Sequence, residues 1–251
     1  MRLRRIVLAA LASFAAAAPA LAGTIPTVCD PAVCGWSINV NGVTVRQGGF
    51  AFDAEGNVTA TGNTSWSNGG ASASITGLSG NVDPEIVFGL GATNSTGGAV
   101  TYSFSFFLPL GGFPVPISSY AELGGSLSSA STGAGSIFVT SGVGKIVDSQ
   151  DIAFAPPQNV DKGVDVGDGV AGTAGTTVLF FSSESDTIVA GGPFDLMSVI
   201  VSFGIFDPAG AGATGVGMSG IVRQTPLVPE PGTALLLGAG LAGLALFRRR
   251  S

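Results

Sequence analysis

The chain has 251 residues, with 10 basic and 16 acidic side chains, no histidine and 40 glycines. The absence of histidine excludes Ser-His-Asp and Cys-His catalysis and every histidine-ligated catalytic metal. Residues 23–227 contain fifteen acids against four bases, which gives this region a net charge of −11. Such an acidic body argues against nucleic acid and anionic membrane surfaces as partners.

Residues 1–22 have the pattern of a secretory signal peptide. Three arginines among the first five residues precede the apolar stretch 6–18, and Ala20-Leu21-Ala22 forms a small-x-small cleavage site. The apolar stretch is shorter than the roughly 20 residues that a spanning helix needs. We therefore expect cleavage after Ala22 and export of the chain.

Cys29 and Cys34, the two cysteines of the chain, lie close to the expected new N-terminus. In an exported protein a C-x4-C pair is most simply a disulfide, with two free thiols as the alternative. A structural zinc site would need further ligands, and histidine is absent.

Residues 23–227 predict an all-β domain. Trp36, Ile38 and Val40 alternate with polar residues, and Asn41-Gly42 is a type I′ turn dipeptide, so we expect a hairpin that continues at Val43. We interpret Trp36 as a core residue. The clearest strand carries five apolar side chains on one face: Val100, Tyr102, Phe104, Phe106 and Leu108.

Further strands are expected at 50–52, 86–90, 136–140, 176–182, 187–190 and 197–206, separated by Gly, Ser, Asn and Pro turns. No window in this region combines a 3.6-residue apolar period with helix caps. The pattern therefore predicts an antiparallel β-sandwich or a jelly-roll-like ectodomain.

The tail, residues 228–251, differs from the body. The two prolines of Val228-Pro229-Glu230-Pro231 favour an extended segment. The uncharged run 233–247 would form a helix of about 22 Å, which is shorter than the roughly 30 Å hydrocarbon core. Arg248, Arg249 and Arg250 would hold its end on the cytoplasmic side. We expect a short transmembrane helix with the body outside.

This tail resembles the PEP-CTERM sorting signal of Gram-negative bacteria, which is recognised by exosortase. The resemblance implies that Pro229, Glu230 and Pro231 form the recognition motif, that 233–247 is the transmembrane segment, and that Arg248 to Arg250 are the membrane stop. It also implies transient anchoring in the inner membrane, then the cell surface or medium, and an association with exopolysaccharide and biofilm. A plain single-span anchor is the alternative.

Candidate sites in the body are few. Asp161, Asp165 and Asp168 lie in a glycine-rich stretch that is either a calcium site or a solvated acidic loop; we expect no other cofactor. Trp66 has polar neighbours and is a candidate for stacking on a sugar ring. Matches to G-x-G-x-x-G at 215–220 and 238–243 lack the strand-turn-helix setting of a dinucleotide site.

Together these features favour a non-enzymatic structural or adhesive protein of an exopolysaccharide matrix. One alternative is a carbohydrate-binding module that uses Trp66. A second alternative is a secreted glycoside hydrolase, because two carboxylates at a suitable separation would be sufficient for that reaction.

Overall fold

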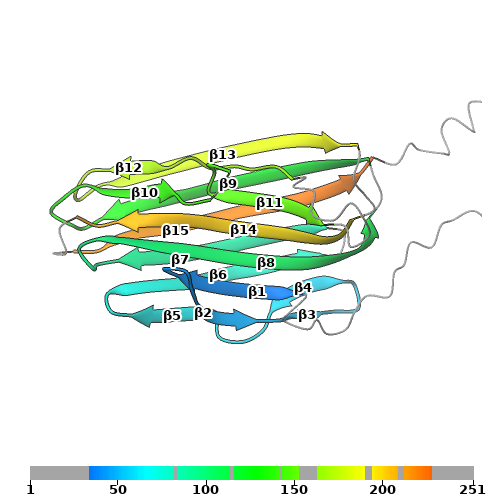
Figure 1. Cartoon of the computed structure of the whole chain (residues 1–251), viewed down its shortest axis with the longest axis horizontal. Coiled ribbons are helices and arrows are strands. Elements are labelled where there is room, and N and C mark those ends of the chain that lie inside the picture. Colours follow the sequence, from blue (N-terminus) through cyan, green and yellow to red (C-terminus); the bar gives the residue numbers. More distant parts are fainter. Residues whose placement is uncertain are drawn as a thin grey trace, which may run out of the picture.

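The computed structural model describes residues 34–81, 84–113, 116–141, 143–152, 163–189, 194–208 and 212–227. In this part of the chain the regular elements are all β-strands, and they pair antiparallel in two sheets of seven and eight strands. Figure 1 shows the two sheets stacked face to face as an elongated sandwich. The predicted all-β antiparallel sandwich is thus confirmed.

The seven-stranded sheet has the order β12-β10-β14-β8-β1-β2, and β11 also pairs with β14. Its long central strands β8 and β14 pair along nearly their full length. The strands are β1 (Gly35–Val40), β2 (Val43–Gly48), β8 (Ala99–Phe113), β10 (Gly135–Val139), β11 (Val147–Ile152), β12 (Val170–Gly172) and β14 (Phe194–Phe206).

The eight-stranded sheet has the order β13-β9-β15-β7-β6-β4-β3, and β5 pairs with β6. Within the described residues, β13, β3 and β5 are therefore bonded on one side only. The strands are β3 (Phe50–Phe52), β4 (Asn57–Ala60), β5 (Ser65–Asn68), β6 (Ala71–Asn81), β7 (Glu85–Asn94), β9 (Ile117–Ser129), β13 (Thr177–Ile188) and β15 (Thr214–Pro226).

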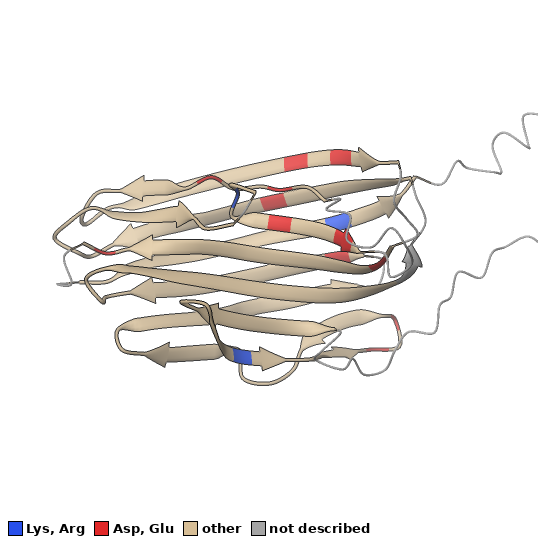
Figure 2. Ribbon diagram, viewed as in Figure 1, with Lys and Arg blue, Asp and Glu red and all other residues tan. Residues whose placement is uncertain are grey.

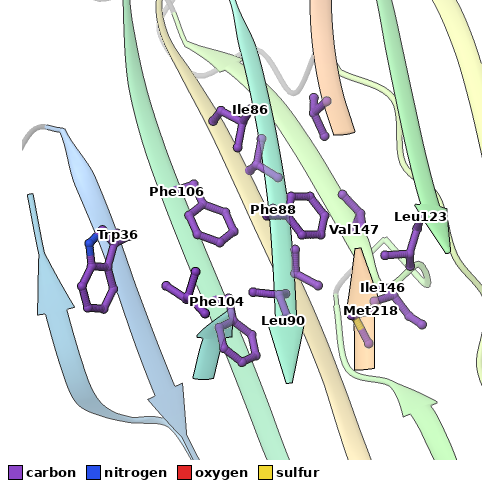
Figure 3. Close-up of a cluster of buried hydrophobic side chains, with 14 of the residues drawn as sticks. Trp36, Ile86, Phe88, Leu90, Phe104, Phe106, Leu123, Ile146, Val147 and Met218 are labelled. Atoms are coloured by element: carbon purple, nitrogen blue, oxygen red, sulfur yellow. The ribbon is translucent and has the colours of Figure 1, made fainter. Parts of the chain in front are cut away.

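The core lies between the sheets and is rich in phenylalanine. The predicted apolar face of β8, from Val100 to Leu108, is at most 4% exposed. Phe106 of β8 stacks on Phe88 of β7 with ring centroids 5.7 Å apart, which joins the two layers (Figure 3). Burying side chains of this size supplies roughly 1.5–3 kcal/mol each.

The predicted β1–β2 hairpin is confirmed. Asn41 and Gly42 have φ values of 49° and 77°, as a type I′ turn requires. Trp36 is 2% exposed and its indole N–H donates to the Thr61 carbonyl at 3.1 Å, so its assignment to the core is also confirmed.

The strand expectations need two corrections. The strands expected at 176–182 and 187–190 are one continuous strand, β13, because its backbone pairs with β9 from Thr177 to Ile188. The strands β6, β9, β11, β12 and β15 were not predicted, and β4 and β5 lie where the sequence showed only weak alternation. The Gly-rich stretch 215–220 lies inside β15, where its backbone is used by β7 and β9, so it forms no dinucleotide loop.

The proposed signal peptide (1–22), Cys29 and the tail from residue 228 lie outside the described residues. Cys34 is buried at the start of β1 and is not a free thiol, but its pairing with Cys29 stays a prediction. In the described ranges no helix has the length and apolar character to cross a membrane.

Candidate functional site

A pocket lies where the edges of the two sheets meet, between β2 and β5. Arg46 of β2 reaches across this edge: its Nε donates to the carbonyl oxygen of Ser65 in β5 at 3.0 Å. Its Nη1 donates to the carbonyl oxygen of Val45 at 2.9 Å. These two hydrogen bonds hold the half-buried guanidinium in place beside β5.

Trp66 of β5 forms the apolar part of the pocket. Its side chain is half-buried, packs against the hydrophobic core and lies opposite Ala73 of β6. Unlike Trp36, it makes no hydrogen bond within the described residues through its indole N–H, and that atom is not among the buried unpaired ones. The indole therefore offers both a partly open apolar surface and a hydrogen-bond donor.

The pocket has a volume of ≈ 300 Å³, which is at the small end of the range for ligand sites, roughly 300–1,000 Å³. Serines are the most frequent of the described lining residues, and none of these residues is Asp or Glu. The serines alternate with Trp66 and Ala73 along β5 and β6, so their side chains lie on the opposite face of the sheet. The lining residues are Arg46, Ser65, Trp66, Ser67, Ser72, Ala73 and Ser74.

The three described strands that form the pocket carry no acidic side chain. Figure 2 shows the acidic residues on strands and loops away from β2, β5 and β6, and none of these three strands contains Asp or Glu. The ion pair seen within the described residues joins Lys145 to Asp168, at 2.9 Å. Arg46 takes part in no ion pair there.

A half-open indole and a fixed cation are groups that can bind a polar ring-shaped ligand. The described lining residues include no Asp, Glu, Lys or His side chain. The sequence pointed to Trp66 but not to Arg46. No local signal marks Arg46, because its contact with Ser65 spans 19 positions and exists only when the two sheets stack.

The predicted acidic loop is only partly described. Asp168 pairs with Lys145, which raises the pKa of the lysine, and Asp165 accepts the backbone N–H of Ser149 at 3.2 Å. Asp161 lies outside the described residues. The described ranges contain no group of three acidic, Cys or His side chains able to hold a metal ion, and the calcium alternative stays an untested prediction.

A polar cluster that the sequence did not reveal lies inside the sandwich. Asp151 of β11 is fully buried and accepts a hydrogen bond from the side-chain amide of Gln224 in β15. Burial raises the pKa of Asp151, and the hydrogen bond from Gln224 lowers it by a smaller amount. The net pKa is about 7. Asp151 Oδ2, Gln224 Oε1 and Ser119 Oγ have no hydrogen-bond partner within the described residues.

The last described strand, β15, leads directly to the predicted sorting signal. Leu227 donates its backbone N–H to the carbonyl of Pro116 at 2.8 Å, and the Pro229-Glu230-Pro231 motif begins two residues later. The motif and Arg248, Arg249 and Arg250 lie outside the described residues. The sandwich therefore holds the chain firmly up to the point where the predicted signal starts.

Fold and pocket together define an antiparallel β-sandwich protein with a small polar pocket at one edge. Residues 227–250 match the family model described as the PEP-CTERM protein-sorting motif. The chain thus carries a PEP-CTERM sorting motif, which confirms the resemblance of its tail. The motif implies recognition by exosortase and sorting of the protein to the cell surface.

The comparisons with curated proteins and with solved structures do not indicate a function for the body of the chain. No curated protein matches the chain. Similar solved structures include the enzymatically active domain of tailspike protein 4 of bacteriophage CBA120 (14% identity, 65% of this chain and 21% of that chain, TM-score 0.22). They also include TmCBM61 in complex with β-1,4-galactotriose (8% identity, 65% and 99%, TM-score 0.24), and the adhesin domain of Epf from Streptococcus pyogenes (10% identity, 72% and 59%, TM-score 0.26). Likeness at this level says nothing about what the present chain binds.

Proposed function

We propose that this chain is a non-enzymatic surface protein with a structural or adhesive role in an extracellular polysaccharide matrix. The observation that carries the proposal is the sorting motif at residues 227–250. The absence of histidine from the sequence, and of carboxylates from the pocket, agrees with a role in binding.

The outer face of the eight-stranded sheet suits an adhesive role. Cross-strand register places Ser126 of β9, Gly217 of β15, Gly91 of β7 and Ser74 of β6 in one row, and small polar residues also dominate the neighbouring rows. On these four strands the row has no side chain larger than serine and presents serine hydroxyls, and exposed Leu179 of β13 continues it at the edge. A polymer with many hydroxyls could lie against it and exchange hydrogen bonds over several strands.

The matrix role is tested in the native host. We expect the recovered protein to lack residues 1–22 and the segment beyond Pro229-Glu230-Pro231, by intact mass, and to be enriched in the polysaccharide fraction. A matched variant with Glu230→Ala should keep its tail and stay in the membrane fraction. A wild-type protein that retains Arg248 to Ser251 in the cell envelope would be an ordinary anchored protein and would contradict the proposal.

A carbohydrate-binding function of the pocket is the second candidate, and the position of Trp66 beside Arg46 favours it. The purified chain is expected to bind polysaccharide from its host, with affinity lost in Trp66→Ala and largely kept in Trp66→Phe, because an aromatic platform remains. Equal binding by all three proteins would show that the sugar is held elsewhere, for example on the outer sheet face.

The glycoside hydrolase alternative predicts release of new reducing ends from the same polysaccharide. We expect none from the purified protein over a range of pH values. Reducing ends that appear with the wild-type chain and disappear on Asp or Glu substitution would establish an enzyme and overturn the non-enzymatic role.

A further inference from the structure

Arg46 has hydrogen-bonding capacity that the described protein does not use. A guanidinium offers five N–H donors. Two of these donate to the carbonyls of Ser65 and Val45, and no hydrogen bond within the described residues uses Nη2. Both used bonds go to neutral acceptors, so they fix the side chain but do not neutralise its charge.

The other described cations, unlike Arg46, each have a carboxylate or an aromatic ring as a partner. Lys145 pairs with Asp168, and Arg223 stacks on Tyr120 with its Cζ 4.9 Å from the ring centroid while Glu85 lies opposite on β7. Arg46 is half-buried and has neither kind of partner. Its charge therefore has no described counter-charge, and a ligand that carries a negative charge could supply one.

Resting on the proposed carbohydrate role, we infer that the pocket takes an acidic sugar unit, a uronate, whose carboxylate meets the free N–H groups of Arg46 while its ring lies against Trp66. The planar fork of a guanidinium matches the two oxygens of a carboxylate better than an ammonium does. The indole N–H of Trp66, which makes no hydrogen bond within the described residues, can donate to a ring hydroxyl.

The overall negative charge of the body does not prevent this. Acidic side chains are absent from β2, β5 and β6, so repulsion comes from more distant groups. At physiological ionic strength charges farther apart than about 8 Å are largely screened. A polyanion can therefore reach the pocket at ordinary salt.

The test compares two polymers with one backbone: polygalacturonate and its methyl ester, which lacks the charge. Binding of the full chain, purified in detergent, is measured by calorimetry at physiological salt. We expect the charged polymer to bind at least about tenfold more tightly, because a hydrogen bond between two charged groups is stronger than one between neutral groups. Arg46→Gln should remove that preference, and Arg46→Lys should restore it in part.

Arg223→Gln is the matched control, since it removes the same charge from β15, which β7 separates from β6. It should leave the preference unchanged. Thermal unfolding checks that each variant is folded. If both polymers bind equally and Arg46→Gln has no effect, the acidic-sugar inference fails; loss of that binding in Trp66→Ala would then keep the pocket's carbohydrate role, and unchanged binding would remove it. If neither polymer binds, both the inference and the pocket's carbohydrate role fail.

Discussion

The buried Asp151–Gln224 contact predicts an unusual pH dependence of stability. An ordinary aspartate titrates near 3.8, whereas the pKa of Asp151 is raised to about 7 by burial. Between these values the folded chain keeps a proton that the unfolded chain has released. The free energy of unfolding therefore falls as pH rises from about 4 to about 7 and levels off above that.

The size of the effect follows from the same shift. Each tenfold difference in proton affinity is worth about 1.4 kcal/mol, so the ionised, buried carboxylate costs the folded state about 4 kcal/mol at most. Asp151→Asn removes the titration but keeps the shape. Its Oδ1 can accept from Gln224 Nε2, and its amide can donate to Gln224 Oε1, which has no partner within the described residues.

Urea unfolding of both proteins from pH 4.5 to 8.5 measures the difference. We expect the variant to match the wild type within about 1 kcal/mol at pH 4.5 and to be more stable by up to about 4 kcal/mol at pH 8. Asp186→Asn, an exposed acid opposite Ser119 on the edge strand, is the control and should leave the slope unchanged. Parallel curves for the wild type and Asp151→Asn would refute the reasoning.

Two packing predictions concern the core. Gly220→Ala would put a Cβ against the Phe88 ring and should lower stability by roughly 1–3 kcal/mol in thermal unfolding, because the core has no room for it. Gly217→Ala, with only a contact at 4.0 Å, should change little; equal effects would contradict the argument. Phe104→Ala should cost roughly 3–5 kcal/mol in urea unfolding, since its side chain is 0% exposed. Phe181→Ala, at 67% exposure, is its control, and a comparable loss there would refute the assignment of Phe104 to the core.

The local sequence pattern was sufficient to predict a strand where large apolar and polar residues alternate. The β8 face from Val100 to Leu108 and the Asn41-Gly42 turn are both as predicted. The same pattern did not predict β9 and β15, because their many glycine and serine residues weaken the alternation. Both strands have partners on either side, so their backbone hydrogen bonds, more than their propensities, hold them in the sheet.

The edge strand β13 is also held in the sheet by backbone pairing more than by its own residue pattern. Its second half contains Glu184 and Asp186, which the sequence presented as a break between two strands. Continuous pairing with β9 carries the strand through them, and they stay exposed. Charges on an edge strand are a common protection against pairing with other chains.

The sequence by itself determined the features that are read as linear signals: the PEP-CTERM motif, the expected signal peptide and the exclusion of histidine chemistry. Only the tertiary structure decided the sites within the body. Arg46 meets β5, and Asp151 meets Gln224 across 73 positions, because stacking and register bring distant strands together. Such contacts depend on which faces of two sheets are buried against each other, and no short stretch of sequence contains that information.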